Sequence, residues 1–146
     1  MIAVDTNLLV YAHREDTPWH ATAFAWLTSV AEGPDPWAIP WPCVHEFLAI
    51  VTHPRIYRPP TPPDRAVDQV DAWFEAPGVS LLAEGPGDVY WPTLKGLVLD
   101  GAVLGAQVHD ARIAALCRHH GIRTLYTADR DFSRFPALTV RNPLVA

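Results

Sequence analysis

Met1-Ile2-Ala3-Val4-Asp5-Thr6-Asn7-Leu8-Leu9-Val10-Tyr11 is the stretch of sequence that decides the fold. Its apolar run stops at Asp5-Thr6-Asn7 and then resumes, which predicts a buried strand followed directly by a helix. Asp5 is therefore expected at a strand-to-helix junction, on the sheet edge where ligand sites of α/β proteins collect. An aspartate in this position is also a common helix cap. The motif by itself leaves both roles open.

Similar strand-and-helix alternation continues along the chain. After the first strand and its short helix, we predict strands at residues 37–40, 79–82, 123–127 and 138–140. We predict helices at residues 17–32, 41–53, 64–74, 88–100 and 106–120, with Thr17-Pro18 opening the first and Asp64 capping the third. This pattern predicts one α/β domain over residues 1–146, with a mostly parallel sheet of about five short strands and helices on both faces.

Bulk composition describes an ordinary globular chain. It has 146 residues, 49% of them hydrophobic and 18% charged, which excludes disorder. Apolar runs are too short to span a bilayer, and no signal-peptide pattern precedes the first strand, so we expect a cytoplasmic protein without a membrane segment. Cys43 and Cys117 fall within apolar helical patterns and are expected to be buried free thiols.

The net charge of −5 at first argues against a nucleic-acid partner. If about four acids belong to one metal site, however, the rest of the surface is nearly neutral. Arginines also concentrate in the last third of the chain. They are Arg112, Arg118, Arg123, Arg130, Arg134 and Arg141.

Four acids are expected to converge although they are far apart in the sequence: Asp5, Glu46, Asp110 and either Asp129 or Asp131. Asp5 and Asp129 follow apolar runs that would end at the same sheet edge, and Glu46 and Asp110 lie in line with apolar helix positions. Two unit charges about 4 Å apart repel by roughly 4 kcal/mol at an effective dielectric near 20. Such a cluster must hold protons or bind a cation.

The available donors favour a hard cation. His119 and His120 are adjacent, and the two cysteines are isolated, so the sequence offers no zinc-like ligand set. Carboxylate and hydroxyl oxygens suit Mg²⁺ or Mn²⁺. Either ion can lower the pKa of a bound water and orient it for attack on a phosphodiester. The acid pattern therefore indicates nuclease chemistry.

Two further segments each allow two interpretations. Residues 53–63 are dense in proline and interleave arginine with Tyr57, which is typical of a stiff connecting loop or of a contact to single-stranded nucleic acid. Trp19 and Trp26 either pack in the core or, together with the segment around Tyr11, form an apolar groove for a partner helix.

Several motifs spread over the whole chain resemble those of PIN-domain ribonucleases, and most closely those of VapC toxins from bacterial toxin–antitoxin pairs. They are Val4-Asp5-Thr6-Asn7, Glu46, His53-Pro54-Arg55-Ile56-Tyr57, His109-Asp110-Ala111-Arg112-Ile113-Ala114 and Thr127-Ala128-Asp129-Arg130-Asp131-Phe132. The resemblance implies a PIN-like three-layer α/β/α fold and Mg²⁺- or Mn²⁺-dependent cleavage of RNA, transfer or ribosomal RNA by analogy with the family. It also implies a homodimer and inhibition by a VapB-type antitoxin.

The resemblance also assigns roles to single residues. Asp5 and Asp110 would be direct metal ligands, and Glu46 and Asp129 would complete the acidic site, with Asp131 able to share or replace the role of Asp129. Thr6, Thr127 and Arg112 are expected on the substrate side, the two threonines as hydroxyls near the metal and Arg112 reaching the phosphate or bracing an acid. Asn7 is expected to tie down its loop by hydrogen bonding.

Two rival functions remain in view at this point. One is a PIN-like scaffold that has lost catalysis and only binds a partner. The other is a metal-dependent phosphohydrolase that acts on small molecules. The retained acids argue against the scaffold, because carboxylates gathered without a metal only destabilise the fold.

Overall fold

The structure is a computed structural model that describes residues 1–145. Within this range the strands are β1 (Ile2–Val4), β2 (Trp37–Pro40), β3 (Val79–Leu82), β4 (Thr124–Tyr126) and β5 (Thr139–Arg141). The helices are α1 (Thr6–His13), α2 (His20–Glu32), α3 (Trp41–Val51), α4 (Pro63–Phe74), α5 (Gly87–Asp100), α6 (Gln107–His119) and the short 3-10 helix η1 (Arg130–Arg134). The predicted alternation of strands and helices is confirmed.

The strands described in residues 1–145 form one parallel sheet in the order β3-β2-β1-β4-β5. The chain moves outward from β1 through β2 to β3, and later places β4 and β5 on the other side of β1. The strand order therefore reverses between β1 and β4. In sheets of this kind a crevice lies at the carboxyl ends of the strands beside such a reversal.

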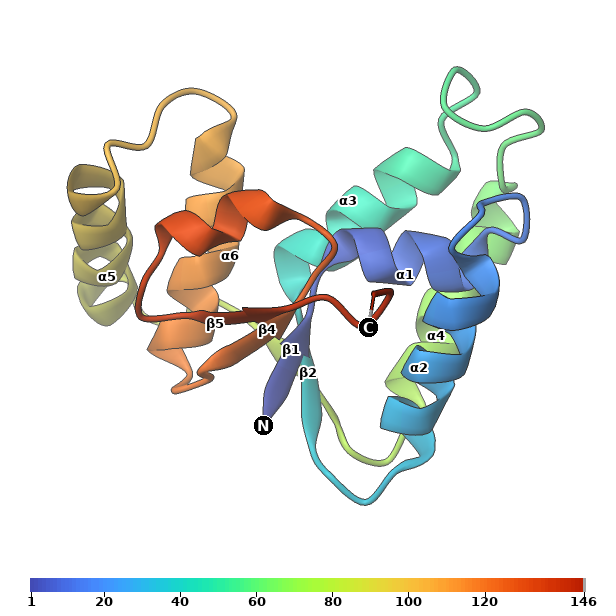
Figure 1. Cartoon of the computed structure of the whole chain (residues 1–146), viewed down its shortest axis with the longest axis horizontal. Helices are drawn as coiled ribbons and strands as arrows, with labels where there is room; N and C mark the ends of the chain where they lie inside the picture. Colours follow the sequence, from blue (N-terminus) through green and yellow to red (C-terminus); the bar gives the residue numbers. More distant parts are fainter. Residues whose placement is uncertain (146) are drawn as a thin grey trace.

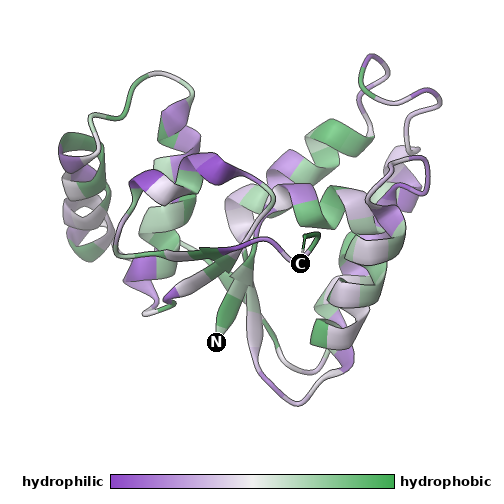
Figure 2. Ribbon diagram, in the orientation of Figure 1, coloured by the Kyte–Doolittle hydropathy of each residue, from purple (hydrophilic) through white to green (hydrophobic). Residues whose placement is uncertain are grey.

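Helices cover both faces of this sheet. In Figure 1, α5 and α6 lie together on one side of the strands, and α1, α2 and α4 lie on the other side. The expected three-layer α/β/α arrangement is confirmed. Figure 2 shows β1 as apolar along its length, and Val4, Ile39 and Leu125 on three neighbouring strands are completely buried.

Phe47 joins three helices of one layer. Its side chain is fully buried in α3, and its ring packs edge-on against Trp73 of α4 at 4.8 Å and against His13 of α1 at 5.3 Å between ring centroids. Because α3 also carries Glu46, this packing sets where that carboxylate lies relative to the sheet.

Two helix starts differ from the sequence prediction. Helix α2 begins at His20 rather than at Thr17, because the Thr17 hydroxyl donates a hydrogen bond to the Arg14 carbonyl (3.1 Å) and closes a turn. Asp64 does not cap α4. Pro62 precedes the helix and Pro63 is its first residue, a position where the missing N–H costs nothing, and Asp64 lies within the first turn.

Two other expectations concern burial and the membrane. Cys43 and Cys117 are buried free cysteines, as predicted. Among the described residues, no helix combines the length and the apolar character that crossing a bilayer requires.

Phe47→Ala should lower the free energy of unfolding by about 3–5 kcal/mol, because it leaves a cavity where three helices meet. Phe24→Ala is a matched control: the Phe24 side chain on α2 is 55% exposed, so its loss should cost less than about 1 kcal/mol. Chemical denaturation measures both values. Equal losses in the two variants would contradict the packing described for Phe47.

Candidate functional site

The candidate site lies at the carboxyl ends of β1 and β4, where the strand order reverses. Asp5 follows β1 and is the N-cap of α1, and its backbone N–H donates to the Tyr126 carbonyl at the end of β4 (3.0 Å). Thr127 then begins the loop that leads from β4 to η1. The two loops that leave the central strands are therefore side by side.

Asp5 is buried and held by four donors. Its Oδ1 accepts the Thr6 backbone N–H (2.7 Å) and the Cys43 thiol (3.6 Å), and its Oδ2 accepts the Thr127 hydroxyl (2.7 Å) and the Asn7 amide (3.5 Å). Burial raises the pKa of Asp5 to about 6, although its hydrogen bonds act in the opposite direction. The capping role and the site role, left open by the sequence, are both compatible with this geometry.

Asn7 and Thr127 tie the two loops together. The Asn7 side chain donates to Thr127 Oγ1 (3.1 Å) and accepts the Ala128 backbone N–H (3.1 Å), and the Asp129 N–H also donates to Thr127 Oγ1 (3.0 Å). The prediction that Asn7 ties down its loop is confirmed. Since Thr127 also holds Asp5, one hydroxyl links the first and last acidic segments of the chain.

Glu46 approaches the sheet edge from α3. It is partly buried, and its Oε2 accepts the Thr6 hydroxyl (2.8 Å). Its negative charge contributes to raising the pKa of both Asp5 and Asp110. Glu46 is therefore the acid that connects Asp5 electrostatically to the acids on the other side of the site.

Asp110, Asp129 and Asp131 form the other half of the site. Each offers a carboxylate oxygen, and the three oxygens lie within 4.8 Å of one another. The pKa of Asp110 is raised to about 6, mainly by burial and then by the negative charges of Asp129, Asp131 and Glu46. The positive charge of Arg134 acts to lower it. The structure thus places both candidates for the fourth acid beside Asp110.

The residues expected on the substrate side lie in two different environments. The hydroxyls of Thr6 and Thr127 are engaged with the acids, since they donate to Glu46 and Asp5. Arg112, in α6, has Glu84 as its charged neighbour, at 4.0 Å, and its side chain is 36% exposed. Within residues 1–145, no ion pair joins Arg112 to any of the four predicted acids, so the expected bracing of an acid by Arg112 is not observed.

Two contributors were not singled out from the sequence. The Cys43 thiol contacts Asp5 across 38 positions, and the docking of α3 against α1, whose N-cap is Asp5, creates this contact. Arg134 ends η1, where its Nε donates to the Asp131 carbonyl (3.2 Å) and its charge opposes the rise in the pKa of Asp110. The one local signal for Arg134 in the sequence was its position three residues after Asp131, because residues at this spacing are neighbours on a helical turn.

The donor set fits a divalent cation with hard oxygen ligands. The carboxylates of Asp110, Asp129 and Asp131 lie together, and Glu46 acts electrostatically on both Asp110 and Asp5. Burial and neighbouring acids raise the pKa of Asp5 and of Asp110 to about 6. Mutual repulsion of this kind is relieved by a bound cation or by protons. Mg²⁺ and Mn²⁺ both prefer such ligands.

The pKa of Asp5 has a consequence for stability. Folding raises it from 3.8 to about 6, so between about pH 4 and pH 6 the folded state binds more protons than the unfolded state. The free energy of unfolding of the metal-free protein should therefore fall as pH rises through this window, by on the order of 3 kcal/mol from Asp5. Asp110 acts with the same sign but less strongly, because it is partly exposed to solvent.

Denaturation of the wild type and of Asp5→Asn at several pH values measures the contribution of Asp5 as the difference between the two curves. The two should approach each other near pH ~4 and separate near pH ~7, with Asp5→Asn the more stable there. Added Mn²⁺ should stabilise the wild type near pH ~7. Parallel curves for the two proteins would contradict a buried, proton-binding Asp5.

Comparison with known proteins agrees with this geometry. The model of the PIN domain family matches residues 2–138. The chain is 36% identical over 144 residues to Ribonuclease VapC43 of Mycobacterium tuberculosis, covering 99% of this chain and 96% of that protein.

Two solved structures share the fold. One is VapBC2 from Rickettsia felis bound to a DNA fragment from its promoter, with a TM-score of 0.67, 20% identity and coverage of 97% of this chain and 98% of the other. The second is VapC20 of M. tuberculosis, described as a sarcin-ricin loop cleaving toxin, with a TM-score of 0.66, 20% identity and coverage of 91% and 93%. This chain belongs to the PIN-domain family and, within it, to the VapC ribonucleases.

Proposed function

We propose that this chain is an endoribonuclease that depends on Mg²⁺ or Mn²⁺ and acts as the toxin of a VapBC-type pair. The observation that carries the proposal is the gathering of acids from four separate elements at one sheet edge. The family relationship adds the substrate class, since the relatives are named ribonucleases. Residues 1–146 would act as one PIN domain, in the cytoplasm where RNA is available.

In this proposal each acid has a distinct task. A bound divalent ion supplies charge neutralisation on the phosphodiester and a more acidic water. Asp5 and Asp110 would be the residues that hold that ion, and the hydroxyl of Thr127 keeps Asp5 in place. Glu46 Oε2 is engaged by Thr6, so Oε1 is the atom that accepts a proton from the water attacking phosphorus.

Hydrolysis then proceeds by attack on phosphorus with departure of one ribose oxygen, which takes up a proton from solvent. Arg134, whose charge acts on Asp110, supplies positive charge for the phosphate. Arg112 lies beside Glu84 and would need to leave this neighbour to contact a phosphate. We therefore assign the phosphate contact to Arg134 ahead of Arg112.

The RNA is proposed to be a transfer or ribosomal RNA. Specific RNA recognition usually exploits loops with unstacked bases, and VapC20, which shares the fold, is described as cleaving the sarcin-ricin loop. Sequencing of RNA 5′ ends after induction of the toxin would identify the molecule and the cut position.

A homodimer and a VapB-type antitoxin are the proposed partners. Trp19 and Phe24 at the start of α2 are 44% and 55% exposed, which supports an apolar docking site for an antitoxin helix. The groove differs from the one expected from the sequence. Leu9 and Val10 beside Tyr11 are buried in the core. Trp26 is partly buried against the core, and its ring centroid lies 4.9 Å from that of Tyr126.

Asp5→Asn and Asp110→Asn should each reduce Mg²⁺-dependent RNA cleavage by more than about 100-fold, because each removes a charged ligand while keeping the side-chain shape. Asp100→Asn, at the end of α5, is the matched control and should cleave normally. Gel assays with purified protein measure the rates, and circular dichroism verifies folding. Full activity in Asp5→Asn or Asp110→Asn would remove the catalytic assignment and favour a binding scaffold.

Asp129→Asn and Asp131→Asn separate the two candidates for the fourth acid. Asp129 is partly buried and its Oδ1 accepts the Asp131 backbone N–H (2.8 Å), whereas Asp131 is exposed. Asp129→Asn should therefore weaken Mn²⁺ binding in calorimetry by about 10-fold or more, and Asp131→Asn by less. The opposite order would transfer the role to Asp131.

A further inference from the structure

The proposed catalytic site leaves one charged feature of the molecule unused. Residues 53–60, His53-Pro54-Arg55-Ile56-Tyr57-Arg58-Pro59-Pro60, leave the end of α3 and contain two arginines and no acid. We call this segment the basic arm. In Figure 1 it projects beyond α3, away from the body of the domain.

Hydrogen bonds give the basic arm a defined shape at both ends. The backbone N–H groups of Ile56 and Tyr57 both donate to the His53 carbonyl (3.1 Å each), which makes a turn directly after α3. Just beyond the arm, the Thr61 N–H donates to the Val51 carbonyl (2.7 Å). The arm therefore leaves and returns at the same point of α3.

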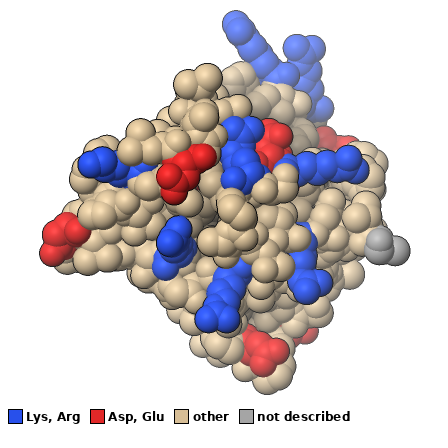
Figure 3. Space-filling view, turned by 60° about the vertical axis from the view of Figure 1, so that its left-hand side comes forward, with Lys and Arg blue, Asp and Glu red and all other residues tan. Residues whose placement is uncertain are grey.

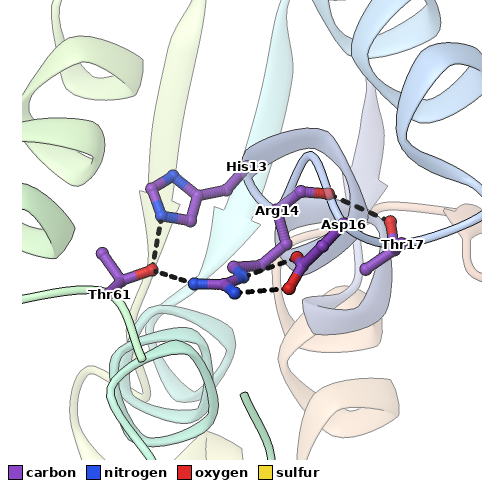
Figure 4. A network of polar contacts seen from close by, with 5 residues as sticks. All are labelled: His13, Arg14, Asp16, Thr17 and Thr61. Atoms are coloured by element: carbon purple, nitrogen blue, oxygen red, sulfur yellow. Dashed lines mark hydrogen bonds and ion pairs between the residues drawn. The ribbon is translucent and has the colours of Figure 1, made fainter. Parts of the chain in front are cut away.

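Side chains from the end of α1 hold Thr61, the residue that directly follows the arm, as Figure 4 shows. The buried Thr61 hydroxyl lies 3.0 Å from His13 Nε2 and accepts from Arg14 Nη1 (3.2 Å), and Arg14 also forms a two-point ion pair with Asp16. The Arg14 guanidinium lies over the Tyr57 ring, 4.4 Å from its centroid. Tyr57 is therefore an anchor of the arm, with one ring face covered, rather than a free platform for a base.

Arg55 and Arg58 are the groups that this anchoring leaves exposed. Within residues 1–145, neither has a carboxylate partner within 4.0 Å. In the last third of the chain, Arg112 faces Glu84, and Figure 3 shows acidic side chains among the basic ones on the face where α5 and α6 come forward. The basic arm is thus a region of positive charge with no acid of its own.

The basic arm begins close to the acidic site. Glu46 and the arm are both carried by α3, and Val51, the last residue of that helix, is five positions beyond Glu46. At 1.5 Å per residue this is about 8 Å along the helix axis. A nucleic-acid strand that passes over the acids therefore has the arm within reach of its neighbouring phosphates.

We propose that Arg55 and Arg58 bind phosphates of the RNA strand on one side of the cleaved bond. This inference rests on the proposed ribonuclease function and adds the surface that positions the substrate. Guanidinium groups match phosphate oxygens with two parallel hydrogen bonds. Exposed ion pairs with a protein partner add little affinity, whereas neutralising RNA phosphates releases counterions and strengthens binding. The charge and exposure of the arm therefore favour RNA over a protein.

The salt dependence of RNA binding tests the arm directly. The parent protein carries Asp5→Asn, so that RNA is not cut, and the probe is a fluorescein-labelled hairpin RNA. Each phosphate contact on a single strand contributes about 0.7 to the slope of log K against log salt. Arg55→Ala/Arg58→Ala should therefore lower the slope by about 1.4, so that the parent loses about sevenfold more affinity than the variant between 50 and 200 mM salt.

Lys95→Ala/Arg118→Ala is the charge-matched control, because both side chains are exposed and lie on α5 and at the end of α6. Its slope should equal that of the parent. An unchanged slope in the arm variant, or an equal drop in the control, would overturn the proposal. Weaker binding of the arm variant to the antitoxin co-expressed from the same operon, with an unchanged RNA slope, would overturn it as well and assign the arm to protein binding.

Activity measurements separate this inference from the proposed function. In the cleavage-competent protein, Arg55→Ala/Arg58→Ala should raise KM for the hairpin and leave kcat unchanged. A wild type that cleaves no RNA with Mg²⁺ or Mn²⁺ would contradict the proposed function. The comparison of salt slopes would still show whether the basic arm binds RNA. A cleaving wild type with equal slopes in parent and arm variant would contradict the arm alone.

Discussion

Repulsion between carboxylates at the carboxyl edge of the sheet is the constraint on which the site depends. The fold brings Glu46 within electrostatic range of both Asp5 and Asp110, and burial together with neighbouring acids raises the pKa of Asp5 and of Asp110 to about 6. A stable protein without a function for these acids would replace them, since buried charges without a cation or donor oppose folding. Their convergence therefore indicates a site that is completed by a cation.

Hydrogen bonds determine how rigidly this edge is held. Thr127 Oγ1 donates to Asp5 and accepts from Asn7 and from the Asp129 backbone, so segments more than 120 positions apart share one hydroxyl. Thr6 does the same for α1 and α3 by donating to Glu46. Acids positioned by such partners need little rearrangement when a cation binds, which is how metal sites keep their geometry.

The sequence predicted the parts of the structure that local patterns determine. The apolar run before Asp5 and the helical position of Glu46 beside Cys43 each carry a local signal, and the order of strands and helices followed from the same kind of pattern. The contact of Cys43 with Asp5 and the anchoring of Thr61 by His13 depend on how helices dock, which no local pattern encodes. The start of α2 was missed because the Thr17 hydroxyl bonds backward to Arg14.

The number of protons released when Mn²⁺ binds tests the central claim most directly. Calorimetry in buffers of different ionisation enthalpy yields this number at each pH. With Asp5 and Asp110 both titrating near a pKa of about 6, the account predicts release of about one proton near pH ~6 and almost none near pH ~8. Mn²⁺ binding without proton release near pH ~6 would contradict it, because the acids would then not be holding protons in place of the cation.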